Sequence, residues 1–359
     1  MPGLDRAGGN MDTTRRQFLL GCSTGVLGAV TAPGGAWADR IRVLGEPADL
    51  DRPLWGAQSS RDLGRWLGSV RAGVAVNHGP LFILWLTAKE TSPPLEVVTL
   101  DEARKSGALV ITERAQASVP ELTVENRGKV HVLLLAGEIL LGGKQNRVLR
   151  EDILLPALSG ARSIGVYCVE QGRWNEGRKE FESKGSFAQP MLRSKLMERA
   201  DQHQVWDAVA RSAREAAPAT PSPTQSYQAL YDDGKIQAHI GEVERVASLR
   251  PPVTAHGAAV FIGSTTPSVD LFHSPSLFTR EWPKLLRAHA LEAYGKALAP
   301  DASEVQRRAQ VQDLLTQASR AEGSLRGNAG VGQLFEFRVG PSRGAALLFE
   351  GRAMHTAIL

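Results

Sequence analysis

The chain has 359 residues, of which 42% are hydrophobic and 22% charged, so it can bury one large core or two smaller ones. Its formal net charge of +4 is too small a bias to indicate binding to nucleic acid. The chain has two cysteines, Cys22 and Cys168, and loss of a leader that contains Cys22 would exclude an intramolecular disulfide.

The first residues are typical of an export signal. Arg15 and Arg16 are followed by Gln-Phe-Leu-Leu and an apolar run, a pattern that looks like a twin-arginine signal. Small residues then stand at positions −3 and −1 of a cleavage site ending at Ala38. We expect residues 1–38 to be a signal peptide, the twin-arginine translocase to be a transient partner, and the mature protein to be periplasmic or otherwise exported.

Two alternatives to a cleaved signal stay open. An uncleaved membrane anchor is disfavoured because the apolar run is shorter than the roughly 20 residues that span a bilayer, so we expect no stable membrane anchor after cleavage. Lipidation of Cys22 is disfavoured because only Gln17–Gly21 separate it from the arginines. Translation begins at either Met1 or Met11.

The mature sequence begins with residues 39–70, which we predict to be a linker or N-terminal arm. After Val98, Thr99 and Glu102 form a capping box that opens a short helix, and Gly107 ends it. The strands predicted in this half are Val70–Val76, Leu81–Thr87, Leu95–Val98, Val119–Glu125, Val130–Leu135 and Arg162–Glu170.

The second half of the chain alternates between helical and strand patterns. A helix-rich insert covers about 190–250, and a further helix follows the strand at Gly257–Gly263, with Pro283 either kinking it or lying in its first turn. A C-terminal helix and hairpin occupy about 303–359. We therefore predict an α+β fold of mixed or antiparallel sheets with inserted helices, in one principal domain over 71–359.

A dense polar block follows the predicted strand Val130–Leu135. Glu138 comes first, and two glycines would then let a ligand approach the main-chain amides. The next four residues supply two cations and two amides, which suit a phosphate or a polar sugar; a plain solvated turn is the alternative. The candidate ligand-binding residues of this block are Gly142, Gly143, Lys144, Gln145, Asn146 and Arg147.

A second polar block, Glu170–Trp174, follows the strand Arg162–Glu170. Arg173 suits a carboxylate or phosphate and Trp174 suits a base or sugar ring, with Gln171 as a further ligand-binding candidate. An internal Arg–Glu network is the alternative. If Glu138 and Glu170 share a cleft, the two carboxylates are candidates for acid–base catalysis.

The positions of the histidines and of Cys168 in the sequence disfavour a metal site and a reactive thiol. The eight histidines are scattered, with no pair four residues apart, so we predict no metal site and no resident cofactor. Cys168 lies inside a strand pattern and is expected to be an inert core thiol. Asp270, which apolar residues flank, suits either a functional role or a cap or turn.

Several of these segments resemble one family in the same order. SVPEL, GEILLGGKQNR, VEQGRW, VWDAV, VDLF and WPKLLRAHALEA are similar to the ARPP-1 domain, which is associated with ADP-ribosylglycohydrolase and rhodanese-phosphatase-superfamily proteins. The resemblance runs from about Arg71 to the C-terminus. It maps the family's characteristic polar residues onto Glu138, Gly142–Arg147 and Glu170–Trp174. It implies an association with ADP-ribose metabolism but no particular reaction.

These observations leave two hypotheses. In the first, the domain binds an anionic small molecule of the sugar-phosphate or ADP-ribose type, and hydrolyses it if Glu138 or Glu170 is a general base. In the second, it is a non-enzymatic protein-interaction module whose Glu/Arg/Gln network is structural. Open charged groups around a concave pocket would favour the first, and mutually satisfied side chains without a cavity would favour the second.

Overall fold

The computed structural model describes residues 52–89, 93–118, 120–174, 179–298 and 303–359. The predicted signal peptide, its cleavage site after Ala38, and Cys22 lie outside these residues, so export stays a prediction. The described residues all belong to one unit, Arg52–Leu359.

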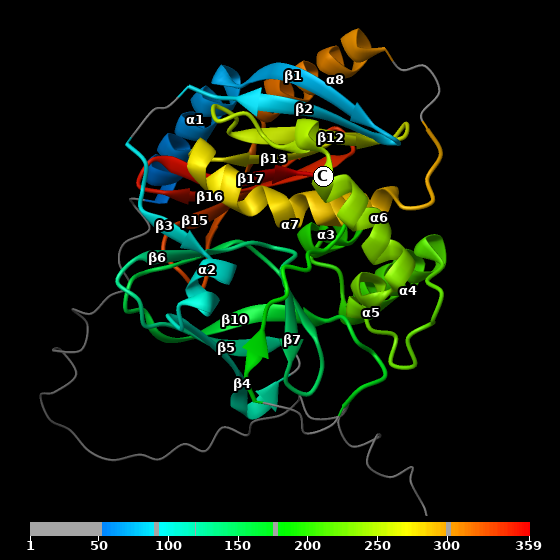
Figure 1. Cartoon of the computed structure of the whole chain (residues 1–359). Coiled ribbons are helices and arrows are strands. Elements are labelled where there is room, and N and C mark those ends of the chain that lie inside the picture. Colours follow the sequence, from blue (N-terminus) through cyan, green and yellow to red (C-terminus); the bar gives the residue numbers. More distant parts are fainter. Residues whose placement is uncertain (1–51, 90–92, 119, 175–178, 299–302) are drawn as a thin grey trace, which may run out of the picture. The chain divides into compact units, whose positions relative to one another are not determined.

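Strands from both ends of this unit form an eight-stranded antiparallel sheet (Figure 1). The apolar run Leu81–Thr87 is a strand as predicted, and its side chains are buried from Leu81 to Leu86. In spatial order the strands are β1 (Arg71–His78), β2 (Leu81–Thr87), β12 (Gly257–Ile262), β13 (Ser268–Phe272), β17 (Arg352–Ile358), β16 (Ser342–Phe349), β15 (Gln333–Val339) and β14 (Gly323–Gly327).

Two smaller sheets come from the middle of the chain. The six-stranded sheet contains, in spatial order, β11 (Phe181–Glu182), β7 (Ile139–Gly142), β8 (Arg147–Leu149), β10 (Gly160–Cys168), β5 (Glu121–Asn126) and β4 (Leu109–Ser118). The three-stranded sheet contains β3 (Val97–Thr99), β6 (His131–Leu134) and β9 (Ile153–Leu155). β3 and β6 pair in parallel, whereas the other strand pairs of the described chain are antiparallel.

Helices pack on these sheets, which confirms the predicted α+β class. They are α1 (Arg52–Ser69), α2 (Leu100–Lys105), α3 (Pro190–Met197), α4 (Gln202–Ala216), α5 (Gln228–Asp232), α6 (Gly234–Arg245), α7 (Pro275–Ala293) and α8 (Glu304–Ala318). The helices α1 and α8 share a core with one face of the eight-stranded sheet. The predicted capping box of α2 is confirmed, because Thr99 and Glu102 each bond the other's backbone amide.

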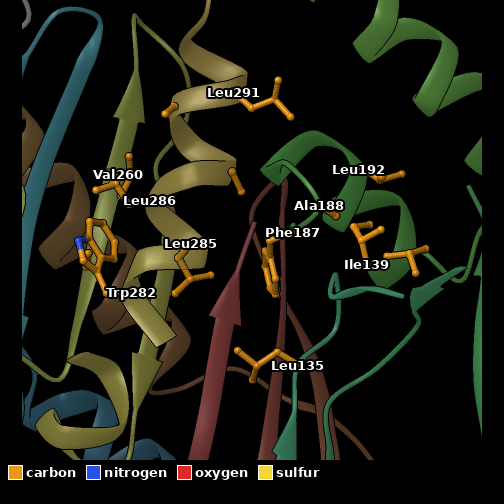
Figure 2. Close-up of a cluster of buried hydrophobic side chains, with 14 of the residues drawn as sticks. Leu135, Ile139, Phe187, Ala188, Leu192, Val260, Trp282, Leu285, Leu286 and Leu291 are labelled. Carbon is orange, nitrogen blue, oxygen red and sulfur yellow. The ribbon is translucent and has the colours of Figure 1, made fainter. Parts of the chain in front are cut away.

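Helix α7 joins the large sheet to the segment that follows β6. Figure 2 shows Trp282, Leu285, Leu286 and Leu291 of α7, with Val260 of β12 on one side and Leu135, Ile139 and Phe187 on the other. These residues form one buried cluster. The short segment from Leu135 to Ile139 is therefore fixed in apolar surroundings at both ends, and the polar residue Glu138 lies within it.

The structure also decides points that the sequence left open. The predicted linker or arm over 39–70 contains α1, whose Leu63, Trp66 and Leu67 are buried at helical spacing. Pro283 lies inside α7 and not in its first turn. Asp270 lies in the strand β13 and is neither a cap nor a turn residue.

Candidate functional site

Glu138 points into the core, although it follows a strand end as predicted. Its Oε2 accepts a hydrogen bond from the backbone amide of Leu135 (2.9 Å), and its Oε1 accepts one from Lys284 Nζ. Gly137 has a φ of 104°, which only glycine adopts easily, and turns the chain sharply before Glu138. The partner of Glu138 thus comes from α7, 146 residues away in the sequence.

Lys284 is surrounded by three carboxylates. Glu281, one turn earlier on α7, lies 2.8 Å from its Nζ, and Asp101 of α2 lies 3.1 Å away. Glu138 is the third. The Glu281 side chain is fully buried, whereas that of Asp101 is 40% exposed and accepts a hydrogen bond from Ser183 Oγ (2.6 Å). The cluster therefore reaches solvent through Asp101.

The charges of this Lys284 cluster are set mainly by burial. Burial raises the pKa of Glu138 from 4.5 to about 8, and the Lys284 ammonium opposes the rise only in part. Burial also raises the pKa of Glu281. Burial lowers the pKa of Lys284, but its three carboxylate neighbours outweigh this, and its pKa lies well above the usual value. Lys284 therefore carries its positive charge, while burial favours the protonated form of both Glu138 and Glu281.

Glu170 belongs to a different network, on the loop after β10. Its carboxylate accepts hydrogen bonds from Arg173 Nε (2.8 Å), the Asn146 backbone amide (3.1 Å) and Thr224 Oγ1 (2.9 Å). Burial raises the pKa of Glu170, but these hydrogen bonds outweigh it and the net pKa is lowered. Glu170 is thus an ionised carboxylate with several hydrogen-bond donors already bound to it.

Arg173 fastens the two polar blocks together. Its guanidinium donates to the backbone oxygens of Gly143 (2.9 Å) and Gly142 (3.3 Å), and to Asn146 Oδ1 (3.1 Å). The first block is not a simple loop, because residues 139–142 and 147–149 form β7 and β8, which pair with each other. Arg173 therefore holds the turn of a β-hairpin.

The glycines of that hairpin are required by their conformation. Gly142 and Gly143 have φ angles of 137° and 52°. A Cβ on Gly143 would lie 2.3 Å from the ring of Phe181 and 2.5 Å from the Glu113 carboxylate. Gly143 is therefore needed for a second reason besides its positive φ: the Phe181 ring and the Glu113 carboxylate leave no room for a side chain at this position.

Arg147 and Gln145 are inside the protein. Arg147 is 0% exposed; its Nη1 donates to the Gln145 backbone oxygen (3.0 Å), and its Nη2 lies 3.6 Å from the Glu113 carboxylate. Gln145 donates to the Glu170 backbone oxygen (2.8 Å) and accepts from Cys168 Sγ (2.9 Å). Burial raises the pKa of the Cys168 thiol to about 11, as expected for a core cysteine.

In the two blocks, Gln171, Gly172 and Trp174 are exposed, and Lys144 is half-buried. The Lys144 ammonium lies 5.2 Å from the centre of the Trp174 ring, a cation–π contact. Trp174 is 53% exposed, and Gln171 is also on the surface. The indole therefore offers one flat face to solvent beside a cation.

A hollow of about 360 Å³ lies next to the hairpin turn. Its floor includes Leu141 and Phe181 together with the two glycines of the turn. Its polar lining consists of the side chains of Arg104, Asn146, Arg173, Glu180, Glu182, Lys184, Gln228 and Asp232. We call this the hairpin hollow. Its lining combines three cations, three carboxylates and two amides.

The family model for the ARPP-1 domain, the ARG and Rhodanese-Phosphatase-superfamily-associated Protein domain, matches residues 69–359. The chain belongs to the ARPP-1 family. This match confirms the resemblance noted from the sequence. No curated protein and no solved structure matches the chain.

Among the described residues, the polar residues of the two blocks divide between separate networks. Glu138 contacts Lys284, whereas Glu170 contacts Arg173, and neither carboxylate lines the hairpin hollow. Gly142, Gly143, Asn146 and Arg173 line it. The physical reason is that the short turn before Glu138 directs its side chain inward, while the hairpin directs its own turn outward.

A second buried network of this ARPP-1 domain was not expected from the sequence. Arg193 of α3 makes two hydrogen bonds to Asp270, of 2.9 and 2.6 Å. His355 Nδ1 lies 2.6 Å from Asp152, and its Nε2 lies 3.1 Å from Asp270. Burial lowers the pKa of His355, but Asp152 and Asp270 outweigh it and raise the pKa to about 9. Asp270 flanked by apolar residues was the sequence signal for this network.

The described ranges contain no group of three or more His, Cys, Asp or Glu side chains that could hold a metal ion. Among the same residues, every helix is too short or too polar to cross a bilayer.

Proposed function

We propose that this ARPP-1 domain binds a small anionic ligand that also carries hydroxyl groups, such as a sugar phosphate or an ADP-ribose-like molecule, in the hairpin hollow. The observation that supports the proposal is the composition of the hollow. Its volume of about 360 Å³ lies within the range of small-molecule sites. Its lining offers donors and acceptors above an apolar floor.

The cations of the hollow suit the anionic part of such a ligand. Lys184 is exposed, and Arg173 is held in place by four acceptors, so its guanidinium has a fixed orientation. Fixed donors lose little conformational entropy when an anion binds. The lining also includes Gln228 and Asp232, which are joined by a hydrogen bond from Gln228 Nε2 to Asp232 Oδ1 (3.0 Å). Their other oxygen atoms can accept hydrogen bonds from hydroxyl groups of a ligand.

We propose that the domain binds the ligand, and we assign neither Glu138 nor Glu170 as a general base for its hydrolysis. Glu138 is separated from the hollow by its pairing with Lys284. Glu170 touches the lining residue Arg173 but is engaged by three donors. Hydrolysis would therefore require one of these carboxylates to exchange its partners.

The rival hypothesis is an interaction module, and the same Arg173 contacts support it. A guanidinium that bonds the backbone of Gly142 and Gly143 and the side chain of Glu170 stabilises the hairpin without any ligand. Hydrogen bonds to charged groups contribute about 1.5–3 kcal/mol each. Arg173→Ala should then lower the melting temperature whether or not a ligand binds.

The test is a thermal-shift and calorimetric screen of the full chain against ADP-ribose, ribose 5-phosphate, nucleotides and peptidoglycan fragments. A ligand at 100 times its dissociation constant should stabilise the protein by about 2.7 kcal/mol. Lys184→Ala should weaken binding and leave the unliganded melting temperature unchanged. Lys179→Ala is the matched control, because Lys179 is exposed and does not line the hollow.

Two results would count against a ligand in the hairpin hollow. One is a screen in which no compound shifts the melting temperature. The other is a hit whose affinity is the same in the Lys184→Ala and Lys179→Ala variants. Either would favour the interaction module.

We also propose that the protein is exported through the twin-arginine translocase. The support is the pattern Arg15-Arg16-Gln-Phe-Leu-Leu followed by a small-residue cleavage site ending at Ala38. Replacing both arginines by lysine should block removal of residues 1–38, as read from the mass of the cellular protein. Arg6→Lys is the control. Unchanged processing in the double variant would exclude this route.

A further inference from the structure

Two arginines stand directly opposite each other at one end of the eight-stranded sheet. Arg338 of β15 and Arg343 of β16 are register partners next to the turn that joins these strands. Register partners project to the same face, and like charges so placed destabilise a sheet. In the part of the chain that the structure describes, no carboxylate lies within ion-pairing distance of either guanidinium. The pair is therefore a concentration of uncompensated positive charge.

This arginine pair borders a hollow of about 490 Å³, larger than the hairpin hollow. The hollow is formed by one face of β14, β15 and β16 and by the end of α3, where Arg199 is located. We call it the arginine hollow. Its volume suits a small molecule, whereas a nucleic acid or a protein would need a wider surface.

Most acidic groups of the arginine hollow already have partners. Glu336 pairs with Arg199 (2.7 Å) and with Arg326 (2.8 Å). Glu198 pairs with Lys195 (2.7 Å). Glu322 has no such partner in the described residues and lies at the rim. The charged side chains of the arginine hollow that have no ion-pair partner among the described residues are therefore Arg338, Arg343 and Glu322.

The sheet register explains why the hollow is open and where it ends. Glu336, Ala345, Ala357 and Asp270 are successive register partners across four strands, so their side chains share one face. The two alanine methyl groups leave an inner cavity of only about 30 Å³, which is also lined by Arg193. That space admits about one water molecule. A ligand would therefore stay in the outer part, beside Arg338 and Arg343.

We propose that the arginine hollow is a binding site for the phosphate group of a small molecule, held between the guanidinium groups of Arg338 and Arg343. Two guanidinium groups on one face can each donate two hydrogen bonds to a tetrahedral oxyanion. The bound anion would also remove the repulsion between the two arginines. This site is separate from the hairpin hollow and does not depend on the function proposed for it.

The test measures binding of inorganic phosphate and of ribose 5-phosphate to the full chain by calorimetry, with melting temperature as the second readout. Arg338→Ala and Arg343→Ala should each weaken phosphate binding by about tenfold or more. Without ligand, both variants should melt at the same temperature as the parent or higher, because a like-charge contact is lost. A purely structural role would instead lower the melting temperature.

Two matched variants sharpen the result. Glu322→Gln should strengthen phosphate binding by up to about fivefold, because it removes the remaining carboxylate. Arg211→Ala should have no effect, since Arg211 is an exposed arginine outside the hollow. Equal affinity for the two compounds would indicate an inorganic phosphate site, and tighter binding of ribose 5-phosphate would indicate a phosphate monoester site.

The proposal would be overturned by phosphate binding that survives in Arg338→Ala and Arg343→Ala, or by no binding of either compound. Binding that is lost in Lys184→Ala but not in these variants would place the anion in the hairpin hollow. That outcome would overturn the arginine hollow and support the proposed function. Loss in Arg338→Ala with full retention in Lys184→Ala would support the arginine hollow, and the hairpin hollow would still be decided by its own ligand screen.

Discussion

The Lys284 ammonium contacts the carboxyl group of Glu138 in a buried pair between helix α7 and the turn after β6. Glu138 is among the polar residues that the ARPP-1 resemblance singles out, and its partner is supplied by another segment of the domain. Leu135, Ile139 and Leu285, which are sequence neighbours of the pair, belong to one buried apolar cluster (Figure 2). In such surroundings a charge without a partner is costly, so the two segments depend on each other for stability.

Lys284→Met should therefore destabilise the domain strongly. The substitution leaves Glu138, Glu281 and Asp101 without their shared counter-charge, and removing one partner of a buried pair costs about 3–5 kcal/mol. Urea unfolding measures the loss. Lys195→Met is the control, because the Lys195–Glu198 pair is partly exposed and should change stability by less than about 1 kcal/mol. Equal losses in the two variants would contradict the prediction.

Stability should fall as the pH rises from about 5 to 9. The pKa of Glu138 is raised in the folded state from 4.5 to about 8, so its contribution is complete below about pH 4.5 and is lost as the pH rises through 8. The pKa of His355 is raised from 6.5 to about 9, and its contribution is lost as the pH rises through 9. Both groups bind more protons in the folded state than in the unfolded state, so the free energy of unfolding that each contributes decreases as the pH rises.

Glu138→Gln provides the check on this pH dependence. The variant cannot titrate at position 138, so its stability should change less than that of the parent between pH 5 and 8. The loss between pH 8 and 9 should remain, because His355 is intact. Identical pH profiles for parent and variant, measured by urea unfolding, would show that Glu138 does not hold the proton.

Gly143→Ala should be more damaging than Gly79→Ala. Both glycines have a positive φ, 52° and 54°, so both substitutions carry the same backbone strain of about 1 kcal/mol. A Cβ at Gly143 also collides with the Phe181 ring and the Glu113 carboxylate, whereas one at Gly79 meets nothing within 4 Å. The difference in unfolding free energy between the variants isolates the packing role. No difference would mean that the hairpin can move away from Phe181.

Cys168 should resist thiol reagents in the folded protein. It is buried and its pKa is raised to about 11, so little thiolate is present near neutral pH. A Cys22→Ser chain has Cys168 as its single thiol. Its labelling at pH 8 should be slow in buffer and fast in denaturant. Rapid labelling of the folded chain would indicate that the loop after β10 opens.

The sequence determined the local features of this protein. The family follows from the resemblance of several segments in one order. The α+β class, the strand Leu81–Thr87, the capping box at Thr99 and the glycine turn at Gly142 follow from apolar periodicity and turn chemistry, which depend on neighbouring residues.

The tertiary structure decided which polar residues meet. Nothing in the sequence near Glu138 indicates that its partner is Lys284, although a lysine and a glutamate within the apolar stripe of α7 are the signal that could have been used. The burial of Arg147 and the alignment of Arg338 with Arg343 likewise depend on strand register. The physical reason is that an ion pair between distant segments is set by how whole elements pack, whereas a cap or a turn is set within a few residues.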